Sequence, residues 1–113
     1  MDIVNSYAQL IKEALTKYAE LITSRPNPNY ELVRLFDDET HQYMLRKLGW
    51  SNNGRVQYIP LHVALRDSKI WIEEDWTEDG IATYFLEKGV PPEHIVLGFY
   101  DPLTREDTEF AVV

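Results

Sequence analysis

Carboxylates are densest in one short segment, whose members are Glu73, Glu74, Asp75, Glu78 and Asp79. Paired acids can bind Mg²⁺ or act as general acid and base. Three adjacent residues of a strand cannot all face one point, because successive side chains point to opposite faces. The later pair lies in the first turn of an expected helix, where carboxylates stabilise the positive helix end. We therefore expect a structural or partner-binding role for this segment and no catalytic one.

The three histidines do not form a metal-binding motif. His41, His62 and His94 lie far apart in the sequence, without local ligand spacing. We interpret them as surface or hydrogen-bonded side chains. The chain has no cysteine, so a thiolate metal site, a cysteine nucleophile and a disulfide framework are all excluded.

The serines and glycines also show no motif for nucleophilic or phosphate chemistry. None of Ser6, Ser24, Ser51 and Ser68 lies in a G-x-S-x-G elbow. The five glycines are scattered, without Walker or dinucleotide spacing. The sequence therefore predicts a protein that is not an enzyme and has no cofactor.

Aromatic residues are the stronger candidates for contacts with a partner. Trp50, Trp71 and Trp76 are many tryptophans for this length, and such rings either fill cores or anchor interfaces. Trp76 stands between acids, so we expect it to be the most exposed of the three. The predicted partner-contact residues are Trp71, Glu73, Glu74, Asp75, Trp76, Glu78 and Asp79.

Basic residues interleaved with aromatic ones leave a second reading open. They are Arg34, Arg46, Arg55, Tyr58 and Arg66. A sheet face carrying them could bind DNA directly, although no RNP-like motif accompanies them. Solvated sheet edges explain the same residues without any ligand.

Charge is distributed unevenly along the 113 residues. The net charge is -8, and residues 73–113 alone carry eleven acidic and two basic side chains. Such a field repels nucleic acid, whose binding depends on neutralising phosphates. It suits either solubility or an acidic face for a basic partner. No signal-like or membrane-spanning run occurs, so we expect a cytoplasmic protein.

Hydrophobic periodicity predicts one α+β domain over residues 1–113. Residues 3–23 repeat apolar side chains at helical spacing, and an Asn- and Pro-rich loop follows. Strands are expected at 30–36, 42–50, 55–66 and 69–73, giving an antiparallel sheet of about four strands. A short helix is expected after Asp75 or Thr77 as the cap, with Glu78 and Asp79 in its first turn. Gly89 and Pro91 should end that helix.

Three details of this prediction concern the sheet and the tail. Pro60 indicates an edge position or a bulge. A two-residue turn at Asp67 and Ser68 would pair Leu65 with Ile70 and Val63 with Ile72, and would place His62 beside Glu73. Residues 95–99 are compatible with a buried strand or an irregular segment, and the apolar residues 110–113 should dock on the core or on another subunit.

Segments spread over nearly the whole chain resemble the XisI family. They are Gly49-Trp50, Arg55 to His62, Asp67 to Glu73, Trp76 to Ala82, Gly89 to Pro91, His94 to Phe99, Pro102, Arg105 and Thr108 to Val112. The first helix matches least, and Ser68 stands where glycine would be expected after the aspartate.

This resemblance implies a controlling factor for excision of the fdxN element, a programmed DNA rearrangement in nitrogen-fixing photosynthetic bacteria. In that system XisF resembles the recombinase, while XisH and XisI are accessory controllers. The family implies no catalytic or cofactor residues to carry over. It implies a XisH-like protein partner, and we also expect a homodimer or higher homo-oligomer that uses the sheet face carrying Trp71 and His62.

Overall fold

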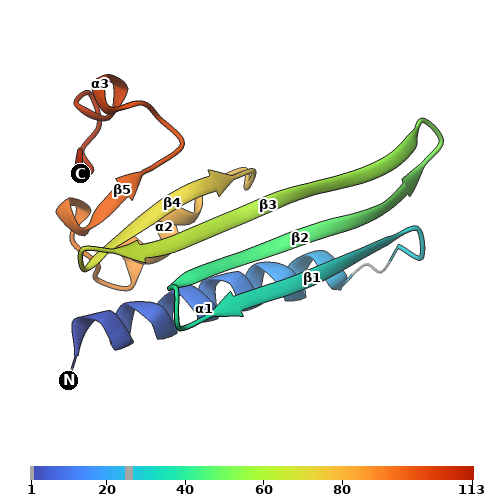
Figure 1. Cartoon of the computed structure of the whole chain (residues 1–113), viewed down its shortest axis with the longest axis horizontal. Helices are drawn as coiled ribbons and strands as arrows, with labels where there is room; N and C mark the ends of the chain where they lie inside the picture. The colour runs from blue at the N-terminus through green and yellow to red at the C-terminus, as the bar shows by residue number, and fades with distance from the viewer. Residues whose placement is uncertain (1, 25–26) are drawn as a thin grey trace.

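The structure, a computed structural model, describes residues 2–24 and 27–113, and it has two layers (Figure 1). The helices are α1 (Ile3–Thr23), α2 (Ile81–Glu87), the 3-10 turn η1 (Pro92–His94) and α3 (Pro102–Arg105). The strands are β1 (Tyr30–Asp37), β2 (Gln42–Ser51), β3 (Gly54–Arg66), β4 (Lys69–Asp75) and β5 (Ile95–Leu97). The predicted α+β class is confirmed.

The sheet has five strands, one more than predicted, in the order β1-β2-β3-β4-β5. The first four are antiparallel neighbours, as their short turns require. β5 lies parallel to β4 and joins it through α2. The apolar run Ile95–Leu97 is too short for its periodicity to distinguish a strand from an irregular segment. Its pairing with β4 shows that it is a strand.

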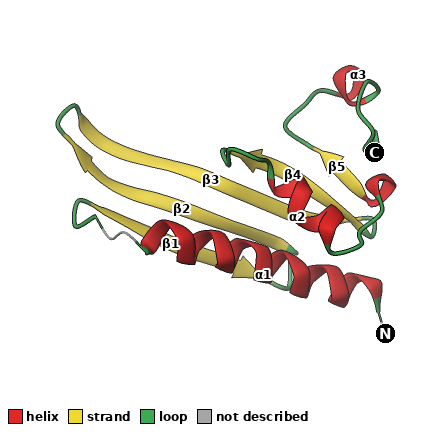
Figure 2. Ribbon diagram, turned by 180° about the vertical axis from the view of Figure 1, so that it is seen from behind, coloured by secondary structure: helices red, strands yellow, loops and turns green. Residues whose placement is uncertain are grey.

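One face of the sheet packs on α1 and α2 (Figure 2). Asp2 caps α1 by accepting the Val4 amide at 3.0 Å. The apolar stripe of α1 then buries Ile11 and Leu15 against strand residues such as Tyr43. These side chains are fully buried, so this layer contains the main core.

The hairpin between β3 and β4 has the predicted pairing near its turn. Val63 pairs with Ile72, and Leu65 with Ile70. His62 pairs with Glu74 instead of Glu73, because a bulge shifts the register between His62 and Val63. The sequence pattern cannot reveal this extra residue.

Two further irregularities in the backbone follow from residue type. The register between β2 and β3 shifts beside Pro60, between the pairs Leu45–Leu61 and Lys47–Tyr58. This confirms the bulge, one of the two predicted alternatives, since β3 is not an edge strand. Gly49 is needed where β2 meets the loop before β1, since a Cβ there would lie 2.2 Å from the Asn29 carbonyl oxygen.

Helix α2 begins later than predicted. Its first residue is Ile81, so Glu78 and Asp79 lie in the preceding loop and not in the first helical turn. Gly80, with a φ of 82°, turns the chain into the helix. Gly89, with a φ of 90°, ends it as predicted.

The tail docks along the edge of β5, with Phe110 against the main core and Ala111 on the opposite face, which confirms docking on the core, one of the two predicted alternatives. Ala111 forms a parallel bridge with Val96, and the two pack with Ala64 and Trp71 in a small second core. Arg105 holds this arrangement by donating to the carbonyl oxygens of nearby turns and of Val112. No helix in the described residues is long and apolar enough to cross a membrane.

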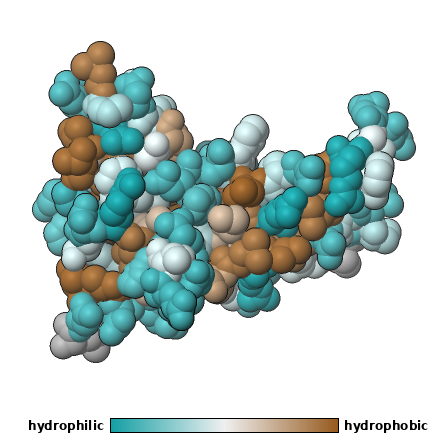
Figure 3. All heavy atoms as spheres, viewed as in Figure 1, coloured by the Kyte–Doolittle hydropathy of each residue, from teal (hydrophilic) through white to brown (hydrophobic). Residues whose placement is uncertain are grey.

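The rest of that outer face is left bare. Leu35 is exposed and Met44, its pair on β2, is half-buried. Figure 3 shows apolar side chains (brown) gathered over the middle of this face. The β2–β3 hairpin also extends beyond the end of α1 (Figures 1 and 2), so part of the helix-side face is open as well.

Candidate partner-binding site

The predicted partner-contact residues lie at the end of β4 and in the loop that leads to α2, but they do not form one surface. Asp75 has a structural role. Its carboxylate accepts the Thr77 amide at 2.9 Å, the Thr77 hydroxyl, and the Ile81 amide at 2.8 Å. The predicted cap at Asp75 or Thr77 is wrong, because Gly80 is the N-cap of α2. The Asp75 carboxylate still accepts the first helical amide from outside the helix, and its oxygens are engaged within the chain.

Trp71 also faces away from this loop. It is 7% exposed, beneath the docked tail. The Arg66 guanidinium lies 3.6 Å from the centroid of its ring, and the Arg105 guanidinium 5.2 Å. Its indole nitrogen is buried without a hydrogen-bond partner in the described structure. The tail thus covers Trp71, which was predicted to contact a partner.

Trp76 is the exposed aromatic residue of the loop. Its side chain is 67% exposed, which confirms the expected exposure and exceeds that of Trp50, at 61%. The indole nitrogen donates to a Glu74 carboxylate oxygen at 3.1 Å. The ring meets Tyr58 edge to face, with centroids 6.1 Å apart. Trp76 is thus held in a defined orientation although most of it contacts solvent.

Trp76 forms one wall of a groove with a volume of about 580 Å³. The opposite wall is the carboxyl-terminal half of α1, where Leu21 is 72% exposed. The loop wall includes the exposed acids Glu78 and Asp79. The contribution of α1 could not be predicted from the sequence, because Leu21 and Trp76, 55 positions apart, meet only through the tertiary fold.

The groove also contains two tyrosines. Tyr84, from α2, has the Lys17 ammonium 5.6 Å from its ring centroid. Burial raises the pKa of Tyr18 above its ordinary value, and the neighbouring Tyr58 and Asp75 add to the effect. Tyr18 therefore stays neutral at physiological pH, and the groove is aromatic with acids on one wall.

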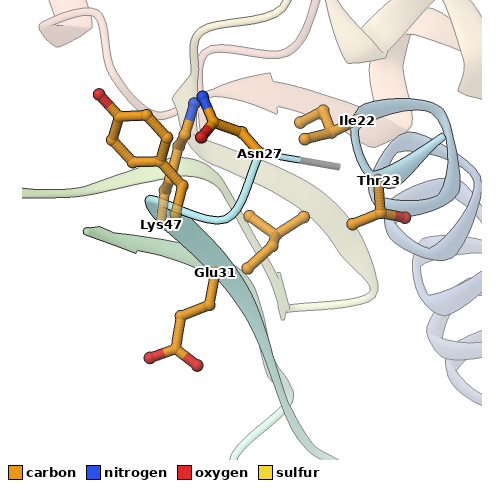
Figure 4. A pocket seen from close by; sticks show the side chains of 7 residues that line it. Ile22, Thr23, Asn27, Glu31 and Lys47 are labelled. Carbon is orange, nitrogen blue, oxygen red and sulfur yellow. The ribbon is translucent and has the colours of Figure 1, made fainter. Parts of the chain in front are cut away.

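A second hollow lies on the other side of the end of α1, with a volume of about 330 Å³ (Figure 4). Ile22 lines both hollows. Here the Lys47 ammonium lies 4.7 Å from the Tyr30 ring centroid and 5.9 Å from that of Tyr58. Tyr30, Lys47, Tyr58 and Trp76 thus form a row across the open part of the helix-side face.

The basic and aromatic residues of the second reading do not gather on one platform. Arg46, Arg55 and Arg66 lie on the outer face, each with its own contact. These contacts are a hydrogen bond to Gln57 at 2.9 Å and stacking on Trp50 and on Trp71. Tyr58 lies on the helix side, next to Trp76.

Two of the three histidines take part in side-chain hydrogen bonds. His62 bonds to the Gln42 side chain at 2.7 Å, and His94 to the Tyr7 hydroxyl at 2.6 Å. This confirms the interpretation made for these two residues. Among the described residues, no three histidine, aspartate or glutamate side chains are placed to hold a metal ion.

The fold and this site define a small α+β protein with an exposed aromatic and acidic groove on the helix side of a mixed sheet. A family model described as XisI protein matches residues 1–112. The chain belongs to the XisI family. A comparison with curated proteins returns no match.

Two crystal structures of proteins from Anabaena variabilis ATCC 29413 share this fold. One is the fdxN element excision controlling factor XisI, which is 37% identical, with a TM-score of 0.88 over 99% of this chain and 100% of that one. The other is a XisI-like protein, which is 30% identical, with a TM-score of 0.90 over 97% of this chain and 99% of that one.

Proposed function

We propose that this chain is a non-enzymatic accessory factor that controls programmed DNA excision by binding a protein partner, a XisH-like protein. Membership of the XisI family supports a role in excision control. One observation carries the mechanism: Trp76 is largely exposed in a loop beside Glu78 and Asp79, which form no ion pair within the described residues. An anchored aromatic with free carboxylates around it is typical of a binding surface.

The charge of the chain determines which partner fits. The acidic last third attracts a basic surface and speeds encounter with it. A basic surface is also what a DNA-binding protein presents to phosphates. Binding to such a surface would place this chain in competition with DNA, and that competition is the proposed form of control.

Direct DNA binding is the alternative function. It rests on Arg46, Arg55 and Arg66, which share the outer face. The guanidinium groups of Arg55 and Arg66 already stack on tryptophan rings, and the net charge of -8 opposes approach to phosphates.

Biolayer interferometry with the XisH-like protein of the same genome tests the proposal. We expect saturable binding that weakens as salt rises and falls at least tenfold for the double variant Glu78→Lys, Asp79→Lys. Glu87→Lys, an exposed acid on α2, is the matched control. Absence of binding by the wild-type chain, or a gel shift of duplex DNA by this chain alone at low salt, would contradict the proposal.

A further inference from the structure

The groove between α1 and the loop before α2 remains open because α1 ends at Thr23 while the sheet continues. Its two walls carry the strongly exposed apolar side chains Leu21 and Trp76. Exposed side chains of this size, facing each other across a hollow, mark an interaction site more often than ordinary surface. The contact with Tyr58 and the bond to Glu74 hold Trp76 in place before any partner arrives.

The groove residues belong to helices and a loop, and none lies on a strand. An incoming extended peptide would therefore find no free strand edge and would leave its backbone groups unpaired. An amphipathic helix satisfies its own backbone hydrogen bonds and needs only an apolar surface. The shape of the groove thus selects a helix.

The charges of the groove determine which charged side chains the partner helix should carry beside its apolar face. Glu78 and Asp79 are exposed on the loop wall, and Glu74 lies against Trp76. Lys17 is the basic residue among those that line the groove, and its ammonium lies toward the Tyr84 ring. Among the residues that line the groove, two carboxylates stand against one ammonium, and this excess of negative charge favours a basic partner segment.

We propose that this groove binds a basic amphipathic helix of a protein partner, with an apolar side chain between Leu21 and Trp76 and basic side chains against Glu78 and Asp79. The inference rests on the proposed function, because it supplies the chemistry of that partner-binding surface.

Two synthetic peptides test the groove without any assumption about the natural partner. Both carry the same leucines at helical spacing, and the remaining positions are lysine in one and glutamate in the other. The lysine peptide should shift the Trp76 indole N–H resonance saturably, with affinity that falls as salt rises. The resonance is assigned through Trp76→Phe. The glutamate peptide should cause no shift.

Variants of the walls provide the controls. Trp76→Ala and Leu21→Asp should each weaken binding of the lysine peptide at least tenfold. Leu103→Ala, at a position 75% exposed on α3, should not. All three positions are exposed, and circular dichroism verifies folding. No shift with the lysine peptide, equal shifts with both peptides, or unchanged binding by Trp76→Ala would overturn the proposal.

The XisH-like protein then separates this inference from the proposed function. If it binds the wild-type chain and Trp76→Ala equally, the inference that the groove binds the partner fails, while the proposed binding of the XisH-like protein is retained. If it does not bind the wild-type chain while the lysine peptide does, the proposed function fails and the inference about the groove is retained. Sedimentation of the chain alone provides the last test: a dimer that Trp76→Ala dissociates would make a second copy the occupant and overturn the proposal.

Discussion

The Asp75 carboxylate accepts the amide of Ile81 at 2.8 Å, six residues further along the chain. The same group accepts the amide of Thr77. One side chain therefore fixes both the start of α2 and the loop that presents Trp76. This contact explains why Asp75 is structural although it lies inside an acidic cluster.

Replacing Asp75 should consequently affect folding and the loop together. We expect Asp75→Ala to lower the free energy of unfolding by about 2 kcal/mol, since hydrogen bonds to a charged group are lost and two amides lose their acceptor. Urea denaturation measures the change. Glu78→Ala, in the same loop without a described hydrogen bond, should change stability by less than about 0.5 kcal/mol. Equal losses for the two variants would contradict this assignment.

Ser68 should be a site of stabilisation. Asp67 and Ser68 both have positive φ, 55° and 62°, as a two-residue hairpin turn demands. A non-glycine residue in this region costs about 1–2 kcal/mol. Ser68→Gly should raise the free energy of unfolding by about 1 kcal/mol, measured by thermal denaturation. Ser51→Gly, outside a positive-φ position, is the control and should not stabilise.

Asp38 should make stability depend on acid pH. The hydrogen bond from Tyr43 at 2.7 Å, and then the bond and charge of Lys12, hold the pKa of Asp38 below its ordinary value of 3.8. A lowered pKa in the folded state means that its stabilising effect is present above the unfolded pKa and is lost as pH falls through the folded one.

The measurement for Asp38 is urea denaturation between pH 7 and pH 2. Wild type should lose more stability than Asp38→Asn below about pH 4. Glu39→Gln, an exposed neighbour that has no described side-chain bond, should follow wild type. Parallel curves for wild type and Asp38→Asn would show that the contact is not stabilising.

Arg105 should control docking of the tail. Its guanidinium donates to the carbonyl oxygens of Tyr100 and Val112 at 2.9 and 3.0 Å and also lies over Trp71. Arg105→Lys keeps the charge but not the planar fork of donors. We expect it to expose Trp71, detected as a red shift of fluorescence in a Trp50→Phe, Trp76→Phe background. Arg55→Lys in the same background, at a position whose guanidinium does not contact Trp71, should leave that emission unchanged.

The bare outer face remains the predicted surface for self-association, although its residues differ from those expected. The tail covers Trp71, whereas Leu35 is 45% exposed beside Met44. We expect a homodimer by light scattering, dissociated by Leu35→Glu but not by Leu103→Glu. A monomer at all concentrations would remove this prediction, without consequence for the groove.

Most helices, strands and turns could be predicted from the sequence, because the residue patterns that indicate them are local. Helical spacing defined α1, and Asp67-Ser68 defined a tight turn whose pairing of Val63 with Ile72 is confirmed. Pro60 lacks an amide hydrogen, which indicated an edge position or a bulge, and the structure shows the bulge. Family membership was likewise readable from residue patterns along the chain.

Long-range placement was decided only by the tertiary structure. Pairing with β4 turned Ile95–Leu97 into a fifth strand, and a bulge moved His62 opposite Glu74. Trp71 and Trp76 are five residues apart, yet one lies beneath the tail and the other in a groove with Leu21. Burial depends on which distant segments pack against a side chain, and such packing leaves no periodic trace in the sequence around it.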